Sequence, residues 1–481
     1  MNENKPTLSP WVQELNQQRE ILQLTKNFKS DIAIIGGGIS GFATAFFLLR
    51  FTNKSVSLIE AGKIGHGATG HNAGQVVDYF EKPFTEIASE YGLELASNGQ
   101  KAISSAWDLL EFILNETKIQ INFSKFIGYA GCTNLHQLNE HLGNKLLKSK
   151  GGIKIHKVRV SEEFKHLDKI PDEYINLYET VPQSKINDLL ETDNSRYIAV
   201  LQSQKGCLNS ALFVEKLSKY LINKYSDRFN LFEQSPVSRL NLYDNYAILH
   251  IREHELRSKR VVLCTNGFEN ITIANNAGGN INRSYHDMVY SRVGYMTGYL
   301  EEKVRDPIAI SYLPQKNTIT DEDIPYFYLT RRNHTFNNQA KSLVCIGGPE
   351  TIQTDDKFKY DNKSEYPDEV KLSNKKFLNK SFKHTPQNLQ DFHFKWHGLM
   401  GYTESGIRCV GIEPINHVLL YNLGCNGVGI LPAIYGSSKI TDHINNLEVP
   451  ESIFDPYVQR RAMPSNVIKK NIKKFANLTR P

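Results

Sequence analysis

The sequence contains no long hydrophobic run. No stretch of about 18 uninterrupted apolar residues occurs among its 481 residues, so we expect no membrane-spanning helix. The first residues, MNENKPTLSPWVQ, are polar and lack the apolar segment of a secretory signal. Hydrophobic residues account for 40% of the chain and charged residues for 22%, a balance typical of a soluble globular protein. We therefore expect a cytoplasmic protein.

Cysteine pairs at metal-binding spacing and common hydrolase motifs are also missing. The six cysteines are scattered and form no CxxC pair, so we expect neither a zinc site nor a disulfide framework, and no bound metal. No GxSxG elbow and no HExxH pair occurs. The chain therefore shows no motif that competes with the nucleotide-binding pattern described below.

Length and charge distribution suggest how the chain is organised. A chain of 481 residues is too long for one simple core, so two domains are the natural expectation. The net charge of +6 is modest, and part of it lies in a C-terminal tail without acidic residues. Such a tail is compatible with contact to nucleic acid or to an anionic membrane, although we favour a solvated helix. Its basic residues are Arg460, Arg461, Lys469, Lys470, Lys473, Lys474 and Arg480.

A strand, a turn and a helix near the N-terminus predict a nucleotide-binding unit. The β-branched run at 31–35 has the composition of a buried parallel strand, and the apolar segment after 41 suits a helix packed under a sheet. Between them, GGGISG at 36–41 matches GxGxxG. In this motif Gly36 permits the tight turn, Gly38 lets the backbone approach a pyrophosphate, and Gly41 allows close packing of helix on strand.

A second predicted strand, at 55–59, ends at Glu60. This glutamate follows Gly41 by about 20 residues, the offset expected for a carboxylate that holds the hydroxyl pair of a ribose. Its charge would repel a 2′-phosphate, which disfavours NADP. The alternative is a glycine-rich turn with an incidental surface glutamate.

The rest of the chain contains further segments with helical and with strand-like sequence patterns. The region 285–350 is rich in β-branched and aromatic residues and predicts a second sheet, and Ser9-Pro10 predicts the start of a short docked helix. Because nucleotide-binding patterns occur at the start, middle and end of the chain, we expect two interleaved domains. Periodicity predicts helices over 84–117, 208–223, 430–444 and within 352–385, and strands over 229–233, 237–242, 246–252, 260–264 and 418–423.

Four later segments resemble a known family. The glycine-rich stretch IGHGATGHNAGQ at 64–75 resembles that of the glycine oxidase and D-amino acid oxidase superfamily, above all its γ-glutamylputrescine oxidase-like and DadA-like branches. VVLCTNGF at 261–268 resembles the family's strand–turn element, and Val237 its backbone step against adenine. YNLGCNGVGI at 421–430 resembles its C-terminal loop. The chain is identified as a member of this family over residues 31 to about 445.

The resemblance implies an α/β fold in which a Rossmann-like FAD-binding domain is interleaved with a mixed β-sheet substrate domain. The helix after the C-terminal loop would point its N-terminus at the N1–C2=O edge of the flavin. We expect the FAD-binding domain at 30–120, 200–282 and 390–446, the substrate domain at 121–199 and 283–389, a leader at 1–29 and a basic tail at 447–481. The expected cofactor-binding residues are Gly36, Gly38, Ile39, Ser40, Gly41, Glu60, Ala61, Gly67, Ala68, Thr69, His71, Asn72, Ala73, Gly74, Val237, Thr265, Asn266, Gly267, Gly424, Asn426, Gly427, Val428, Gly429 and Ile430.

On the substrate side, the resemblance implies an FAD-dependent oxidase or dehydrogenase of a small amine or amino acid, in which the flavin takes a hydride from the carbon that bears the amine. RVGYM at 292–296 and PYFYLTRR at 325–332 resemble strands of the family's substrate sheet. Alternation puts Tyr326 and Tyr328 on one face, and their hydroxyls or an arginine fork would hold a substrate carboxylate. The candidate catalytic residues are Tyr326, Tyr328, Arg331 and Arg292; the alternative is a cross-strand tyrosine pair with solvent-facing arginines.

Four positions depart from the family pattern. Arg408 and Cys409 stand before Val410-Gly411, where the family commonly has a proline. Met400 occupies the place of the cysteine that attaches flavin in monomeric sarcosine oxidases, which closes that covalent route. His71 replaces the arginine of most relatives, as does the flavin-linked histidine of dimethylglycine dehydrogenase and its kin. Non-covalent FAD is the favoured expectation, and a covalent link to His71 is the alternative.

Two other function classes stay open. A tRNA-modification enzyme that uses FAD would bind tRNA with strongly salt-dependent affinity, and the basic tail is compatible with it. A non-catalytic FAD-binding interaction protein would be yellow but would not be bleached by any amine. We rank nucleic-acid binding below a small-molecule substrate and keep peripheral membrane contact of the tail as an alternative. Oxygen and a quinone both remain candidate electron acceptors.

Overall fold

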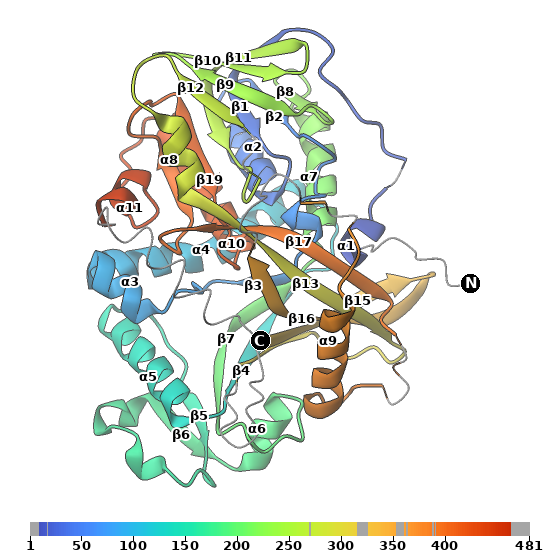
Figure 1. Cartoon of the computed structure of the whole chain (residues 1–481), viewed down its shortest axis with the longest axis vertical. Coiled ribbons are helices and arrows are strands. Elements are labelled where there is room, and N and C mark those ends of the chain that lie inside the picture. Colours follow the sequence, from blue (N-terminus) through green and yellow to red (C-terminus); the bar gives the residue numbers. More distant parts are fainter. Residues whose placement is uncertain are drawn as a thin grey trace.

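Two sheets form the framework of the molecule, one above the other in Figure 1, with helices around them. The computed structural model describes residues 9–16, 18–268, 271–314, 326–352, 360–361, 364–386, 389 and 391–462. Most of the expected basic tail, from residue 463 onward, lies outside the described residues. No helix in the described part of the chain is long and apolar enough to cross a membrane.

The first sheet has a parallel centre flanked by an antiparallel meander. Its order is β12-β9-β10-β11-β1-β2-β8, and β19 and then β18 continue from β11. The pairs β8–β2, β2–β1, β1–β11 and β11–β19 are parallel, whereas the pairs β9–β10 and β10–β11 are antiparallel. The strands are β1 (Phe28–Ile35), β2 (Val56–Ile59), β8 (Phe229–Phe232), β9 (Val237–Leu242), β10 (Ala247–Ile251), β11 (His254–Leu263), β12 (Thr272–Asn275), β18 (Cys409–Ile412) and β19 (Leu419–Leu423).

Helices cover one face of this sheet because their apolar sides meet it. Helix α2 is buried from Ile39 to Leu49, as its nearly continuous apolar sequence predicts, and it packs against α10. The predicted helix over 84–117 is broken at Gly92, which adopts φ +83° between α3 and α4. The helices here are α2 (Ile39–Phe51), α3 (Phe84–Tyr91), α4 (Leu93–Thr117), α7 (Ser210–Lys224) and α10 (Ile430–Ile444).

The opposite face of the first sheet carries a second core. Apolar side chains of the meander and of β19 pack there with Ile281 and Tyr285 of α8 (Ile281–Met288). The sheet is thus buried on both sides, which explains why its central strands are continuous apolar runs.

The second sheet is larger and mixed, with the order β17-β13-β16-β15-β14-β4-β7-β5-β6 and β3 beside β7. Strands β3, β7 and β17 belong to it although the expected FAD-binding ranges contain nearly all their residues; the domain boundaries stay a prediction. Its strands are β3 (Gln75–Val77), β4 (Ser124–Cys132), β5 (Val158–Ser161), β6 (Tyr178–Val181), β7 (Ala199–Cys207), β13 (Val289–Glu301), β14 (Ile308–Tyr312), β15 (Phe327–Phe336), β16 (Gln339–Ile352) and β17 (Phe394–Thr403). The remaining helices are α5 (Leu135–Lys150), α6 (Gln183–Leu189), α9 (Asp368–Ser381) and α11 (Pro456–Ala462).

The N-terminal leader begins with the short docked helix that the sequence predicts. In α1 (Pro10–Gln13) the Ser9 side chain accepts a hydrogen bond from the Trp11 N–H, and proline occupies the first turn. Trp11 is completely buried, and Leu15 is buried with it. The part of the leader around α1 is therefore packed into the folded body.

Candidate functional site

The loop between β1 and α2 has the geometry of a dinucleotide-binding turn. Gly36 has φ +114°, and a Cβ there would lie 2.5 Å from the Cys264 carbonyl oxygen. A Cβ at Gly41 would overlap the Gly36 carbonyl oxygen, and one at Gly38 would lie 2.9 Å from Thr69 Oγ1. Close approach of the backbone thus requires glycine at 36 and 41, the Thr69 side chain crowds position 38, and α2 starts directly behind the loop.

Glu60 stands at the end of β2 beside this loop. Its carboxylate accepts hydrogen bonds from the Gly37 N–H and the Gly62 N–H, both at 2.7 Å. Burial raises the pKa of this carboxyl despite those bonds. The segment that leads into Val237 runs alongside, with the Ser235 N–H donating to the Glu60 carbonyl at 2.9 Å. The residues expected around the adenosine therefore lie together.

The second glycine-rich stretch is a compact turn held by Asn72. Its side-chain amide donates to the Thr69 carbonyl at 2.9 Å and to Ser210 Oγ at 2.8 Å, and its Oδ1 accepts from the Gly74 N–H at 2.7 Å. The Asn72 carbonyl accepts from the indole of Trp11 at 2.5 Å. The leader and the stretch over 64–75 are thus locked together.

His71 lies within this turn, against the second sheet. Its Nδ1 donates to the Gly67 carbonyl at 3.0 Å. Burial lowers the pKa of His71 to about 4, so the imidazole is neutral at physiological pH. Strand β17 runs directly past it, because a Cβ at Gly398 would lie 2.6 Å from the His71 carbonyl oxygen.

Three further segments, at 266–267, 400–401 and 425–426, contact one another near this turn. Asn266, in the left-handed region at φ +55°, accepts through Oδ1 from the Cys425 N–H at 2.9 Å. The Asn426 N–H donates to the Gly401 carbonyl at 2.9 Å, and a Cβ at Gly267 would lie 2.9 Å from the Met400 carbonyl oxygen. Helix α10 follows directly, and no side chain caps its N-terminus. The uncapped end leaves backbone N–H groups available to an anionic group.

The tyrosines expected on the substrate side share one face of the second sheet. The Tyr326 and Tyr328 rings are 5.6 Å apart. The Tyr326 hydroxyl donates to Ser311 Oγ at 3.2 Å. Arg292 comes from β13; its guanidinium lies 4.7 Å from the centre of the Tyr402 ring and 3.8 Å from a Glu350 oxygen. The structure thus brings three of the four candidate catalytic residues to one side of the sheet.

Arg331 is the exception, and its expected role is corrected here. It lies on the other face of β15, where its guanidinium binds both Glu191 oxygens at 2.6 and 2.7 Å and donates to the Asp306 carbonyl. Strand alternation explains this placement, because Arg331 lies three positions after Tyr328 and residues at an odd offset point to opposite faces. Three of its five N–H groups are bound on this face, so the guanidinium does not point toward the tyrosines or toward a substrate carboxylate beside them.

Sequence reasoning missed several charged groups beside the C-terminal loop. A Cβ at Gly427 would lie 2.9 Å from Glu81 Cγ and 3.1 Å from the Tyr402 hydroxyl. Glu81 keeps an exposed surface, but desolvation by the protein around its carboxyl raises its pKa to about 7, and the charge of Glu350 adds to the rise. Lys205 is buried, its Nζ lies 3.3 Å from Ser311 Oγ, and burial lowers its pKa to about 8. No motif contains these residues, so local sequence held no signal for them.

We call these groups together the polar cluster. They come from β7, β13, β15, β16 and β17 and the segments that precede α3 and β15. The cluster consists of Glu81, Lys205, Arg292, Tyr326, Tyr328, Glu350 and Tyr402. It combines two carboxyl groups, two cations and three hydroxyls next to the loop that carries Gly427.

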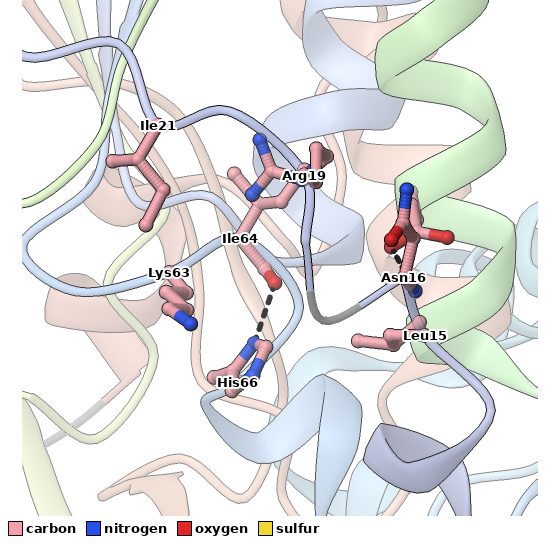
Figure 2. A pocket seen from close by; sticks show the side chains of 8 residues that line it. Leu15, Asn16, Arg19, Ile21, Lys63, Ile64 and His66 are labelled. Atoms are coloured by element: carbon pink, nitrogen blue, oxygen red, sulfur yellow. Dashed lines mark hydrogen bonds between the residues drawn. The ribbon is translucent and has the colours of Figure 1, made fainter.

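Figure 2 shows a small pocket between the leader and the start of the second glycine-rich stretch. Arg19 binds both oxygens of the buried Glu233 at 2.5 and 2.6 Å, and Glu233 accepts from the Ile64 N–H at 2.7 Å. Arg19, which belongs to the leader, thus lines the pocket while it is held by its ion pair with Glu233. Its lining residues are Leu15, Asn16, Arg19, Ile21, Lys63, Ile64, His66 and Glu215. Within the described ranges, no group of three or more His, Cys, Asp or Glu side chains could hold a metal ion.

Two sequence relatives support the resemblance. γ-Glutamylputrescine oxidoreductase of Escherichia coli (strain K12) is 30% identical over 90 residues, which cover 19% of this chain and 21% of that protein. The probable oxidoreductase OrdL of Haemophilus influenzae is 24% identical over 340 residues, which cover 69% of this chain and 70% of that protein. The chain thus aligns with only a fifth of the first relative but with most of the second.

Solved structures share the fold. Glycine oxidase from Geobacillus kaustophilus superposes with a TM-score of 0.60 at 14% identity, covering 89% of this chain and 98% of that one. L-Proline dehydrogenase from P. horikoshii gives a TM-score of 0.64 at 15% identity, covering 90% and 99%. Residues 31–436 match the family model described as FAD dependent oxidoreductase (DAO). This match spans most of the chain and confirms the resemblance, and the protein therefore belongs to the family of FAD-dependent oxidoreductases.

Proposed function

We propose that this protein oxidises the C–N bond of a small amine or amino acid, with FAD as the hydride acceptor. The observation that carries the proposal is the polar cluster beside the loop at 424–430. Solved structures of the same fold include a glycine oxidase and an L-proline dehydrogenase, whose names state an amino acid as substrate. That substrate class agrees with a cluster that contains both carboxyl groups and cations.

The residues present fit FAD. The glycines of the loop at 36–41 leave no room for a Cβ, as the approach of a pyrophosphate to backbone N–H groups requires. Glu60 is held beside that loop, where a ribose hydroxyl pair would be its natural partner. The uncapped N-terminus of α10 would face the flavin end. When bound, FAD supplies the two-electron acceptor that no protein side chain offers.

The polar cluster offers the acid–base chemistry that an amine substrate needs. An alkylamine is an ammonium ion at neutral pH and has to lose a proton before hydride transfer from its carbon is favourable. Glu81 has a pKa of about 7, so its carboxylate can hold the ammonium group and accept its proton near physiological pH. The hydroxyls of Tyr326 and Tyr328 lie close enough to orient the same molecule.

An anaerobic screen tests the proposal. Purified protein is mixed with a panel of amines and amino acids, and flavin absorbance is followed until one compound bleaches it. With that compound, Tyr326→Phe and Tyr328→Phe are expected to raise KM or lower turnover while FAD stays bound. Phe336→Leu, on the same strand and outside the polar cluster, is the matched control. If dithionite reduces the flavin but no amine or amino acid does, the proposed chemistry is wrong.

A further inference from the structure

Arg408 is a buried cation in the middle of the nucleotide-binding framework. It lies just before β18 and is 5% exposed. Its Nε donates to Asn422 Oδ1 at 2.7 Å, and its Nη2 donates to the Asn422 carbonyl at 2.8 Å and to Ser40 Oγ at 2.9 Å. All three acceptors are uncharged.

The charge of Arg408 has no carboxylate partner within the described residues. The other buried arginines do have one, since Arg331 binds Glu191 and Arg332 binds Glu14. Burying an unpaired guanidinium is costly, and desolvation lowers the pKa of Arg408 to about 10, which still leaves it charged at neutral pH. The ionisable groups nearest to it are thiols such as Cys264, whose pKa burial raises, so they add no negative charge.

The position of this charge indicates what its partner is. Ser40 belongs to the first turn of α2, directly behind the glycine loop, and Asn422 lies near the end of β19, where the loop at 424–430 begins. Parallel β1 and β19 end at the same edge of the sheet, so the guanidinium sits between the two segments that frame a dinucleotide. The N-terminus of α2 is the place where such folds bind phosphate groups.

We propose that Arg408 supplies the positive charge that compensates the pyrophosphate of FAD. The inference rests on FAD binding and not on amine oxidation. The family commonly has a proline at this position, so the added cation is a feature of this chain. The fold accepts a buried, unpaired charge because the dinucleotide brings the missing negative charge. Arg408 acts through the phosphate site and is a positioning residue.

Titration of the flavin-free protein with FAD, ADP and adenosine tests this assignment. Arg408→Met is expected to weaken FAD and ADP binding by at least about tenfold, the effect of losing a charge-assisted contact, and to leave adenosine binding unchanged. Arg408→Lys is expected to restore most of the affinity for both. Ser437→Ala is the matched control, because Ser437 joins the same network through Asn422 Nδ2 at 3.1 Å without contributing charge. Raising the ionic strength is expected to weaken FAD binding less in Arg408→Met than in the native protein.

Two outcomes would overturn the assignment. If Arg408→Met lowers the melting temperature and leaves the ADP dissociation constant unchanged, the residue only supports the packing of α2 on β19. If ADP binding is unchanged but the flavin midpoint potential falls, the charge serves the flavin ring. Should the Met variant fail to fold, the phosphorus NMR shifts of FAD bound to Arg408→Lys decide, because they move only if the guanidinium faces the pyrophosphate. None of these measurements depends on turnover.

Discussion

Glu81 is the residue whose protonation state should govern the reaction. Desolvation raises its pKa to about 7, so the carboxyl is largely protonated below that pH and ionised above it. Since the ionised form is the one that accepts the ammonium proton, we expect kcat/KM to rise as the pH increases through about 7. Glu81→Gln should lose this limb of the pH profile, while Glu86→Gln, on an exposed position of α3, should keep it. Persistence of the limb in Glu81→Gln would assign the proton to another group.

His71 determines whether the flavin is attached covalently. Its imidazole is neutral, which a bond to the flavin would require, but its Nδ1 already donates to the Gly67 carbonyl. We therefore expect acid precipitation to release all yellow colour into the supernatant. His66→Ala serves as a control for a nearby histidine. Colour that stays in the pellet of the native protein and is lost in His71→Ala would establish the covalent link instead.

The leader is tied to the second sheet by Glu14. Glu14 binds the buried Arg332 and accepts from His334 Nδ1 at 2.8 Å. Burial opposes ionisation of Glu14, but these partners outweigh it and its pKa falls below the ordinary value. Glu14→Gln should therefore reduce stability by about 1–3 kcal/mol, the cost of leaving a buried polar partner unsatisfied.

The pH dependence of that loss has a defined sign. Because the folded pKa of Glu14 is depressed, its contribution is complete above the unfolded pKa and disappears as the pH falls through the folded one. Thermal melts of native protein and Glu14→Gln should thus converge in acid. Glu20→Gln, in an exposed position of the leader, should match the native protein at every pH. Identical melting temperatures for Glu14→Gln and native protein at every pH would show that the ion pair adds no stability.

Local sequence patterns correctly predicted those elements whose structure depends mainly on residues that are close in sequence. The glycine loop at 36–41, the helices α7 and α10 and the shared face of Tyr326 and Tyr328 follow from close backbone approach, hydrophobic periodicity and strand alternation. Alternation should also have placed Arg331 on the opposite face. The break at Gly92 was missed because the apolar period continues across it.

Long-range pairing was beyond the reach of local patterns. Strand β17 pairs with β13, and β3 pairs with β7, across gaps of about a hundred residues or more, and nothing in their own residues specifies the partner. The polar cluster depends on that pairing, because Glu81 and Glu350 are remote in sequence and belong to no motif. Part of the cofactor site could therefore be predicted, and most of the substrate side could not.

Across the whole molecule, the proposed cofactor site lies where segments of the two sheets meet. Segments that begin at Gly36 and end at Ile430 meet there, and β17 of the second sheet packs against both His71 and Gly267. Removal of FAD should therefore loosen both sheets and not the glycine loop alone. Restoring FAD at a thousandfold excess over its dissociation constant should stabilise the protein by about 4 kcal/mol, whereas riboflavin, without the adenosine and pyrophosphate, should stabilise it far less.

Hydrogen exchange is the decisive measurement: we expect β17 and the segment at 264–267 to gain protection together with the loop at 36–41. Protection confined to that loop would mean that the sheets are stable independently of the cofactor.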